Sequence, residues 1–381
     1  MRLYILSDTA APHTRRWARW FAKRGHEVHV VSFNPDALPS YEPAIVHSIW
    51  KSGGRNALPQ RVLKVPVIIA RLRGLIREFP PDLVHAHSAG GYAWAAMLCG
   101  FRPYVVTPWG TDLLVDVKRS GMNRWLTGHA LRRAALVTTD GFHFVDILRS
   151  FGVPTERTLV HTFGTDVHHF SSGPGEGERL ALDVGDGPLV ISTRTLNPVH
   201  DVETFIRAIP AIHRAFPSAR FVVVGDGIDR LRLEDLAAKL GVSDVTRFTG
   251  MVDEERMRRV LRASNIYVST SIMDAGLAGS TAEAMATSLP VIQTDNSDNA
   301  YWTPDGEGGL LIPNSDPAVL AEATIRLLQD PGKAHRMGMR NREVIVKKNN
   351  VDIELAKIEA AYEHLRLNSG SILNRHNPTT A

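Results

Sequence analysis

The chain has 381 residues, 44% of them hydrophobic and 22% charged, which is typical of a globular protein with large buried cores. No apolar run reaches the roughly 18–20 residues of a membrane-spanning helix, and the first residues predict a strand, not a signal peptide. The single cysteine, Cys99, excludes a disulfide framework, so we expect a cytoplasmic protein.

The formal net charge of +4 is unevenly distributed. Residues 1–170 contain 21 Lys and Arg against 12 Asp and Glu, whereas residues 171–381 contain 23 against 28. The basic half predicts an anionic partner, either a lipid-phosphate or acidic glycan acceptor or an anionic membrane surface, with a solvated basic surface as the alternative. The basic residues at helical spacing are Arg15, Arg16, Arg19, Lys23, Arg71, Arg73, Arg77, Lys118, Arg119 and Arg124. We therefore hypothesise a peripheral contact with the inner face of the cell membrane. Among anionic partners, we do not expect a nucleic acid.

Strand and helix patterns alternate through the first 170 residues, which predicts an α/β domain with a parallel sheet. The expected strands are Arg2–Leu6, His26–Ser32, Leu83–His85, Tyr104–Thr107, Ala135–Thr138 and Thr158–Val160. The expected helices are His13–Arg24, Arg61–Glu78, Gly90–Cys99, Asn123–Arg133 and His143–Phe151.

The Gly-, Ser- and acid-rich stretch 171–187 predicts a linker, after which a second α/β domain is expected at 188–350. Its expected strands are Leu189–Ser192, Phe221–Val224, Arg247–Thr249, Ile266–Val268, Leu289–Ile292 and Leu310–Ile312. Residues 351–366 predict a terminal helix, and residues 367–381 predict a disordered tail. The fold class is α/β, with two Rossmann-like doubly wound domains facing across a cleft at the carboxyl ends of their strands.

Small residues lead into a helix at Gly279, Ser280 and Thr281, and Glu283 lies one turn inside. A helix N-terminus exposes free N–H groups and the positive end of the helix dipole, which favours phosphate binding. The alternative is a Ser-x-x-Glu capping box between Ser280 and Glu283. A short apolar strand and the stretch DGEGGLLIP at 305–313 follow.

This order of motifs, with Glu-Ala-Met-Ala at 283–286, resembles the retaining glycosyltransferases of family 4, the group 1 glycosyltransferases of GT-B fold. The resemblance extends from Met1 to about Arg366. It implies that Glu283 binds the nucleotide ribose, that the backbone of residues 279–281 holds a diphosphate, and that the terminal helix packs on the first domain. The chain departs from the pattern at Ala275, where the family has its first acid, and at Val199, where the family has a lysine; Asp274 and His200 stand beside these positions.

Arg194 follows the strand Leu189–Ser192, so its planar guanidinium should reach a diphosphate at the strand ends; the alternative is a surface ion pair. Gly225-Asp226-Gly227 fails as a dinucleotide fingerprint because Arg230 occupies the third glycine position, and a tight turn is favoured. The resemblance implies that further residues line the donor site; these are Gly225, Asp226, Gly250, Met251, Ala275, Gly276, Leu277 and His200.

In the first domain, His87 ends a strand and should reach the cleft or its edge, whereas His85 is expected to be a core residue. The resemblance implies acceptor contacts near Trp109, where many relatives have a histidine; a tryptophan offers only an N–H and a stacking face. Asp112 is expected to bind an acceptor hydroxyl or, alternatively, to cap the following turn. Thr14 and Arg15 complete the expected acceptor site.

No two aspartates are two positions apart, so the metal-binding Asp-x-Asp motif is absent from the sequence and we expect no metal and no cofactor. We expect Arg194, Glu283 and His87 to be the catalytic residues. The expected function is retaining transfer of a sugar from a nucleotide-diphosphate sugar, the co-substrate, to a glycan or lipid-linked acceptor. A GT-B epimerase, an inverting transferase and a non-catalytic nucleotide-sugar-binding module stay open as alternatives.

Overall fold

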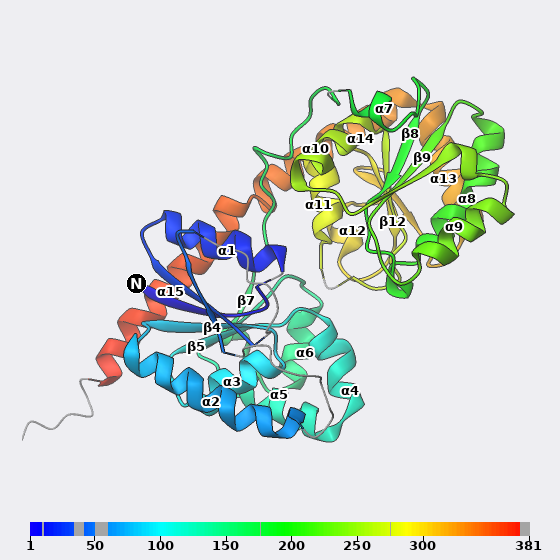
Figure 1. Ribbon diagram of the computed structural model, residues 1–381. Coiled ribbons are helices and arrows are strands. Elements are labelled where there is room, and N and C mark those ends of the chain that lie inside the picture. Colours follow the sequence, from blue (N-terminus) through cyan, green and yellow to red (C-terminus); the bar gives the residue numbers. More distant parts are fainter. Residues whose placement is uncertain (10, 34–41, 50–59, 176, 275, 374–381) are drawn as a thin grey trace, which may run out of the picture. The chain divides into compact units, whose positions relative to one another are not determined.

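The computed structural model describes residues 1–381 except 10, 34–41, 50–59, 176, 275 and 374–381. The chain divides into two compact units, one made of residues 1–161 with 355–381 and the other of residues 162–354. Each unit is a parallel β-sheet covered by helices, so the expected α/β class with two Rossmann-like sheets is confirmed (Figure 1).

The sheet of the first unit has seven strands in the order β3-β2-β1-β4-β5-β6-β7. They are β1 (Arg2–Leu6), β2 (Glu27–Ser32), β3 (Ile45–Ser48), β4 (Leu83–His87), β5 (Tyr104–Thr107), β6 (Leu136–Thr139) and β7 (Thr158–Val160). The helices are α1 (Pro12–Lys23), α2 (Gln60–Glu78), α3 (Gly91–Cys99), α4 (Val117–Arg119), α5 (Gly121–Arg133) and α6 (Phe144–Ser150), with a π-helical turn at Asp112–Asp116. The residues of β4 are buried throughout, as expected for a central strand with helices on both faces.

The sheet of the second unit has six strands in the order β10-β9-β8-β11-β12-β13. They are β8 (Leu189–Ser192), β9 (Arg220–Val224), β10 (Thr246–Gly250), β11 (Ile266–Ser269), β12 (Val291–Thr294) and β13 (Gly309–Ile312). The helices are α7 (Glu178–Ala181), α8 (Val202–Ala215), α9 (Arg230–Lys239), α10 (Glu254–Ala263), α11 (Gly279–Ala286), α12 (Asn299–Trp302), α13 (Pro317–Gln329) and α14 (Pro331–Lys348). Because β8 and β11 are neighbours, the loops after these two strands meet at one edge of the sheet.

The stretch 171–187, expected to be a linker, belongs to the second unit, which begins at residue 162. It contains α7, and the Glu178 side chain is only 4% exposed because it pairs with Arg256 (2.8 Å) and Arg259 (3.3 Å) of α10. A buried carboxylate that pairs with two guanidinium groups packs this segment on α10, and the structure places the whole stretch within the second unit.

The last helix, α15 (Val351–Leu373), belongs to the first unit from Leu355 onward. Tyr362 is fully buried there, stacks on Phe21 with 5.4 Å between ring centroids, and its hydroxyl hydrogen-bonds His85 Nδ1. The helix continues to Leu373, so the prediction of disorder is wrong for residues 367–373; the remaining tail, 374–381, lies outside the described residues. Polar contacts one turn apart extend the helix, such as Asn368 with His364 at 2.8 Å.

Candidate active site

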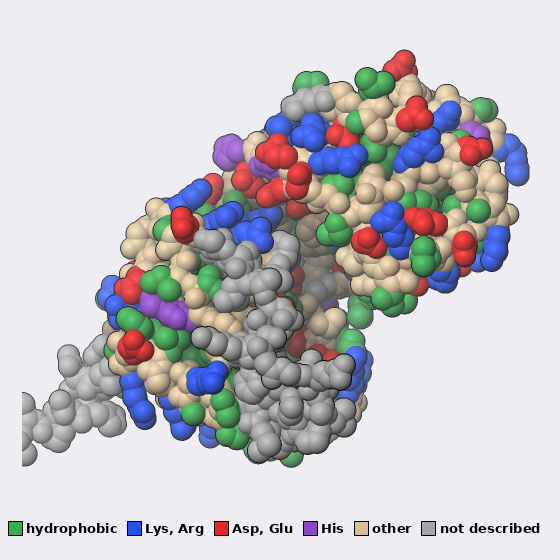
Figure 2. Space-filling view, viewed as in Figure 1, with side chains coloured by type: hydrophobic (Ala, Val, Ile, Leu, Met, Phe, Trp, Pro, Cys, Tyr) green, Lys and Arg blue, Asp and Glu red, His purple; other side chains and the backbone are tan. Residues whose placement is uncertain are grey.

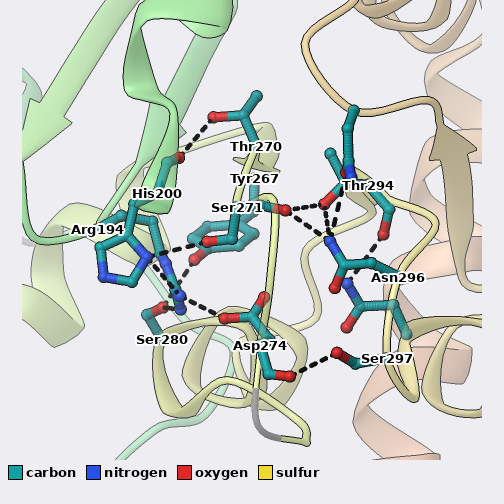
Figure 3. A network of polar contacts seen from close by, with 12 residues as sticks. Arg194, His200, Tyr267, Thr270, Ser271, Asp274, Ser280, Thr294, Asn296 and Ser297 are labelled. Carbon is teal, nitrogen blue, oxygen red and sulfur yellow. Dashed lines mark hydrogen bonds and ion pairs between the residues drawn. The ribbon is translucent and has the colours of Figure 1, made fainter. Parts of the chain in front are cut away.

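A connected network of polar side chains lies where β8 and β11 end in the second unit, and Arg194 is at its centre (Figure 3). The Arg194 side chain is only 9% exposed and forms an ion pair of 2.5 Å with Asp274. The guanidinium also contacts Ser280 Oγ at 3.1 Å and His200 Nδ1 at 3.0 Å. The alternative of a surface ion pair therefore does not hold, because both charged groups are buried.

The Gly225–Gly227 turn packs directly against the backbone of the loop that carries Arg194. A Cβ at Gly225 (φ +137°) would lie 2.4 Å from the Arg194 carbonyl oxygen, and a Cβ at Gly227 would lie 2.3 Å from that of Leu196. The Leu196 N–H also donates to Asp226 O at 3.0 Å. The two glycines therefore let the connection between β9 and α9 approach the backbone of the Arg194 loop closely.

We expect Gly225→Ala to lower the free energy of unfolding by roughly 2–4 kcal/mol, because the new Cβ clashes with backbone and the residue has a positive φ. The matched control is Gly241→Ala, at φ +69° with nothing within 4 Å of the new Cβ, which should cost only about 1–2 kcal/mol. Urea unfolding of both variants measures the difference. Equal losses would show that the contact with the Arg194 loop is not tight.

The helix α11 begins at Gly279, with Ala278 as its N-cap. Its first intrahelical hydrogen bond runs from the Ala282 N–H to Ala278 O (2.9 Å), so the N–H groups of residues 279–281 precede the helical ladder. Ser280 is a helical residue, and its Oγ contacts Arg194 and accepts a hydrogen bond from the Tyr267 hydroxyl at 3.0 Å. The alternative of a capping box with Ser280 as the N-cap therefore does not hold, because the N-cap is Ala278 and the Ser280 hydroxyl belongs to the Arg194 network. Glu283 is half-buried within the same helix.

His200 is neutral at pH 7, because burial, followed by the nearby charge of Arg194, lowers its pKa to about 4. Its Nδ1 receives the guanidinium N–H of Arg194 and lies 3.1 Å from Ser271 Oγ. A guanidinium can only donate, so Nδ1 must accept and the ring proton is on Nε2. The network thus holds one cation, one carboxylate and a neutral imidazole with a single N–H.

Several members of the network were missed by the sequence analysis. Asp274, Tyr267, Ser271, Thr294 and Asn296 are all within it, and Asn296 donates to Ser271 O at 2.6 Å. The available signal was position for four of them, because Ser271, Asp274, Thr294 and Asn296 follow or end the apolar strands β11 and β12, whereas Tyr267 lies within β11. Asp274 supplies a carboxylate next to Ala275, which itself lies outside the described residues.

The remaining expected donor residues differ in their contacts and in their exposure. Gly250 O accepts from the Gly225 N–H at 3.0 Å, so these two loops are joined. Met251 is 73% exposed, Gly276 is buried, and Leu277 packs on the core of the unit. Asp226 pairs with Arg230 at 3.2 Å.

In the first unit, His87 was expected to reach the cleft or its edge, but its side chain does not reach the surface. It is fully buried, with ring centroids 4.7 Å from Trp17, 4.5 Å from His85 and 6.1 Å from Trp109. Burial lowers its pKa to about 3, and neither ring nitrogen has a hydrogen-bond partner among the described residues. The neighbouring aromatic rings cover the strand end that the sequence assigned to the cleft.

Two of the expected acceptor residues of the first unit, Asp112 and Thr14, are buried. Asp112 is 5% exposed and accepts from the backbone N–H groups of Ala89 (2.6 Å), Trp109 (3.1 Å) and Leu113 (3.0 Å), which is the capping alternative. Burial raises the pKa of Asp112, although these hydrogen bonds act to lower it. Thr14 is fully buried and hydrogen-bonds Ser7 at 2.6 Å, whereas Arg15 is exposed.

Within the described residues, no group of three or more His, Cys, Asp or Glu side chains is arranged to hold a metal ion. Among the same residues, no helix combines the length and apolar character needed to cross a bilayer.

The comparisons with known proteins agree with this architecture. Residues 2–141 match the family model "Glycosyl transferase 4-like" and residues 181–344 match "Glycosyl transferases group 1", together more than half of the chain. The chain belongs to the group 1 glycosyltransferases. It is 26% identical over 362 residues to EpsD of Bacillus subtilis (strain 168), which carries the name of a glycosyltransferase, covering 90% of this chain and 91% of that protein.

Other relatives also match over nearly the whole length of both chains. The phosphatidyl-myo-inositol mannosyltransferase of Mycobacterium leprae (strain TN) is 26% identical over 359 residues, covering 92% of this chain and 91% of that enzyme. Anabaena HepE, solved in complex with UDP and glucose, superposes with a TM-score of 0.80 at 18% identity, covering 95% of this chain and 99% of HepE. The fold is therefore GT-B, and the protein is a glycosyltransferase.

Proposed function

We propose that the chain transfers a sugar from a nucleoside-diphosphate sugar without a metal ion, and that the diphosphate binds between Arg194 and the N-terminus of α11. The observation that carries this proposal is the contact between Arg194 and Ser280, which brings a guanidinium to the first turn of that helix. Guanidinium and helix N–H groups together form a site for a diphosphate. The neutral His200 adds its Nε2–H beside Val199, where the resembling family has a lysine.

The chemistry of such a site is stabilisation of the leaving group. Negative charge grows on the departing diphosphate as the glycosidic bond breaks, and preorganised donors are most effective at that moment. Arg194 and the N–H groups of residues 279–281 would supply this positive potential, a role that metal-dependent enzymes give to a cation held by Asp-x-Asp. The proton of the acceptor hydroxyl can pass to the leaving phosphate, so no dedicated side-chain base is needed.

Retention of the anomeric configuration and a glycan or lipid-linked acceptor are the finer parts of the proposal. Retention rests on the resemblance to family 4, and the anionic acceptor rests on the charge of residues 1–170. Epimerisation or donor binding without turnover would follow from the same pocket if no acceptor were used. Detection of a sugar-extended product separates transfer from both alternatives.

A thermal-shift assay tests the donor site. UDP, GDP and UDP-glucose are added with and without EDTA, and we expect at least one nucleotide to raise Tm equally in both conditions. A ligand at a hundredfold excess over its Kd stabilises the folded state by about 2.7 kcal/mol. The control is Arg207→Ala, which removes an arginine that is 47% exposed on α8 and should keep the full response. A response that EDTA abolishes would contradict metal-independent binding.

A further inference from the structure

The segment formed by α4 and α5 in the first unit carries a concentration of positive charge. Residues 117–133 contain five Lys and Arg residues and no Asp or Glu. Lys118, Arg119, Arg124, Arg132 and Arg133 are all exposed. The nearest acid along the chain, Asp116, is already paired with Arg119 at 2.9 Å. We call this the α5 surface, and its charge favours an anionic partner.

The α5 surface also exposes large apolar side chains. Met122 is 64% exposed and Trp125 is 57% exposed, and the two lie one turn apart on the same helix. The Trp125 ring packs against His129 of the same helix, with 4.2 Å between ring centroids and 39° between the ring planes. Exposed tryptophan beside basic residues is typical of elements that lie at a membrane interface.

A cavity of about 310 Å³ opens on the same surface. It is lined by Gly121, Arg124, Trp125, Gly128 and Arg132 of α5, with Ser150 and Phe151 at the end of α6. The Arg124 guanidinium lies 5.0 Å from the centre of the Phe151 ring and, within the described part of the chain, has no hydrogen bond or ion pair. Arg132 donates to Phe151 O at 2.9 Å. One wall of the cavity therefore presents a cation that contacts an aromatic ring and whose guanidinium has no acceptor among the described residues.

Other basic faces of this unit lack this combination. On α2, Arg71 donates to Ile49 O and Arg73 donates to the carbonyls of Leu98 and Cys99, so both are used within the fold. Figure 2 shows Lys and Arg side chains over α1 as well as beside α4. On α1, however, the large apolar residues Trp17 and Phe21 are buried in the core. On the α5 surface, exposed basic residues, exposed apolar side chains and a cavity occur together.

We propose that the α5 surface docks on an anionic phospholipid bilayer. The phosphate of one lipid headgroup occupies the cavity beside Arg124, and Trp125 and Met122 enter the boundary between headgroups and acyl chains. Lys118, Arg119, Arg132 and Arg133 add electrostatic attraction to the negative surface. The contact is peripheral, because the apolar area is limited to two side chains.

The proposal deepens the proposed function by assigning membrane contact to one surface, yet its test does not depend on that function. The α5 surface and the Arg194 network belong to different units. Vesicle binding and the nucleotide response can therefore fail independently, and each failure identifies which proposal is wrong.

Vesicle co-sedimentation tests the surface. Vesicles of phosphatidylcholine alone are compared with vesicles that contain about 30% phosphatidylglycerol. We expect binding only to the anionic vesicles, weakened at least tenfold by Arg124→Ala with Trp125→Ala and by about 0.5 M salt. The matched control is Arg336→Ala with Leu231→Ala, which removes an exposed arginine and a 76% exposed leucine from the second unit and should bind as the wild type.

Each other outcome overturns the proposal. Equal binding to both vesicle types would remove the charge argument, and full binding by the Arg124→Ala, Trp125→Ala variant would place any membrane contact elsewhere. Binding of soluble glycerol phosphate but not of vesicles would identify a free phosphate ester as the ligand. Equally tight, equally sensitive binding of a single-stranded RNA would identify a nucleic-acid surface. Circular dichroism confirms that the exposed substitutions leave the fold intact.

Discussion

Replacing Arg194 with alanine is expected to lower kcat by about 10²–10³, which is the usual cost of removing one donor to a developing negative charge. The physical reason is that Arg194 places its guanidinium in contact with Ser280 in the first turn of α11. Release of nucleotide from a responsive nucleotide sugar measures the loss. Arg194→Lys should recover only part of the activity, because an ammonium cannot reproduce the planar fork.

This substitution also leaves Asp274 as a buried carboxylate without its ion-pair partner, so a loss of activity could come from unfolding. The double variant Arg194→Met, Asp274→Asn removes both charges and should unfold close to the wild type in urea. It should still lack activity and nucleotide response. Wild-type kcat in this folded double variant would show that the diphosphate binds elsewhere.

Acidification is expected to destabilise the protein steeply below pH 6.5. Burial lowers the pKa of His13 to about 4 and that of His87 to about 3, and it lowers the pKa of His85 well below its ordinary value. In the unfolded chain each of these groups titrates near 6.5, so below that pH the unfolded state binds more protons than the folded state. Each group therefore removes about 1.4 kcal/mol of stability per pH unit, from about pH 6.5 down to its folded pKa.

The contribution of His87 can be isolated with His87→Leu, which has a similar volume and cannot titrate. Between pH 6.5 and 4.5 the variant should lose roughly 2.7 kcal/mol less stability than the wild type. Urea midpoints at several pH values measure the slopes. The control, His168→Leu, replaces an exposed histidine and should keep the wild-type slope. Identical slopes for His87→Leu and the wild type would mean that His87 is protonated in the folded state.

The parts of the fold that could be predicted from the sequence are the strands with continuous apolar runs. Central strands such as β4 and β8 are buried on both faces, so their pattern is unambiguous. The strand β3 (Ile45–Ser48) was missed because every residue in it is partly or fully exposed at the sheet edge. The helix α7 was missed because its Gly-rich flanks resemble a linker, although buried Glu178 anchors it.

Three residues of the candidate site could be predicted from the sequence, but the network that surrounds them could not. The expected Arg194, Ser280 and His200 are in contact, as the strand-end argument requires. Asp274 and Tyr267 joined them only because β8 and β11 are adjacent, a pairing that the sequence does not reveal. The burial of His87 could not be predicted for a related reason. The contact of Trp17 with His87 depends on how α1 packs on β4.

The return of α15 to the first unit has a practical consequence for dissecting the protein. Residues 162–354 form a continuous stretch, so the second unit could be produced as a single uninterrupted polypeptide. The first unit could not, because a fragment ending at residue 161 would lack Tyr362 and leave Phe21 and His85 without their covering ring. A soluble version of that half would need residues 355–373 spliced onto it through an artificial connection.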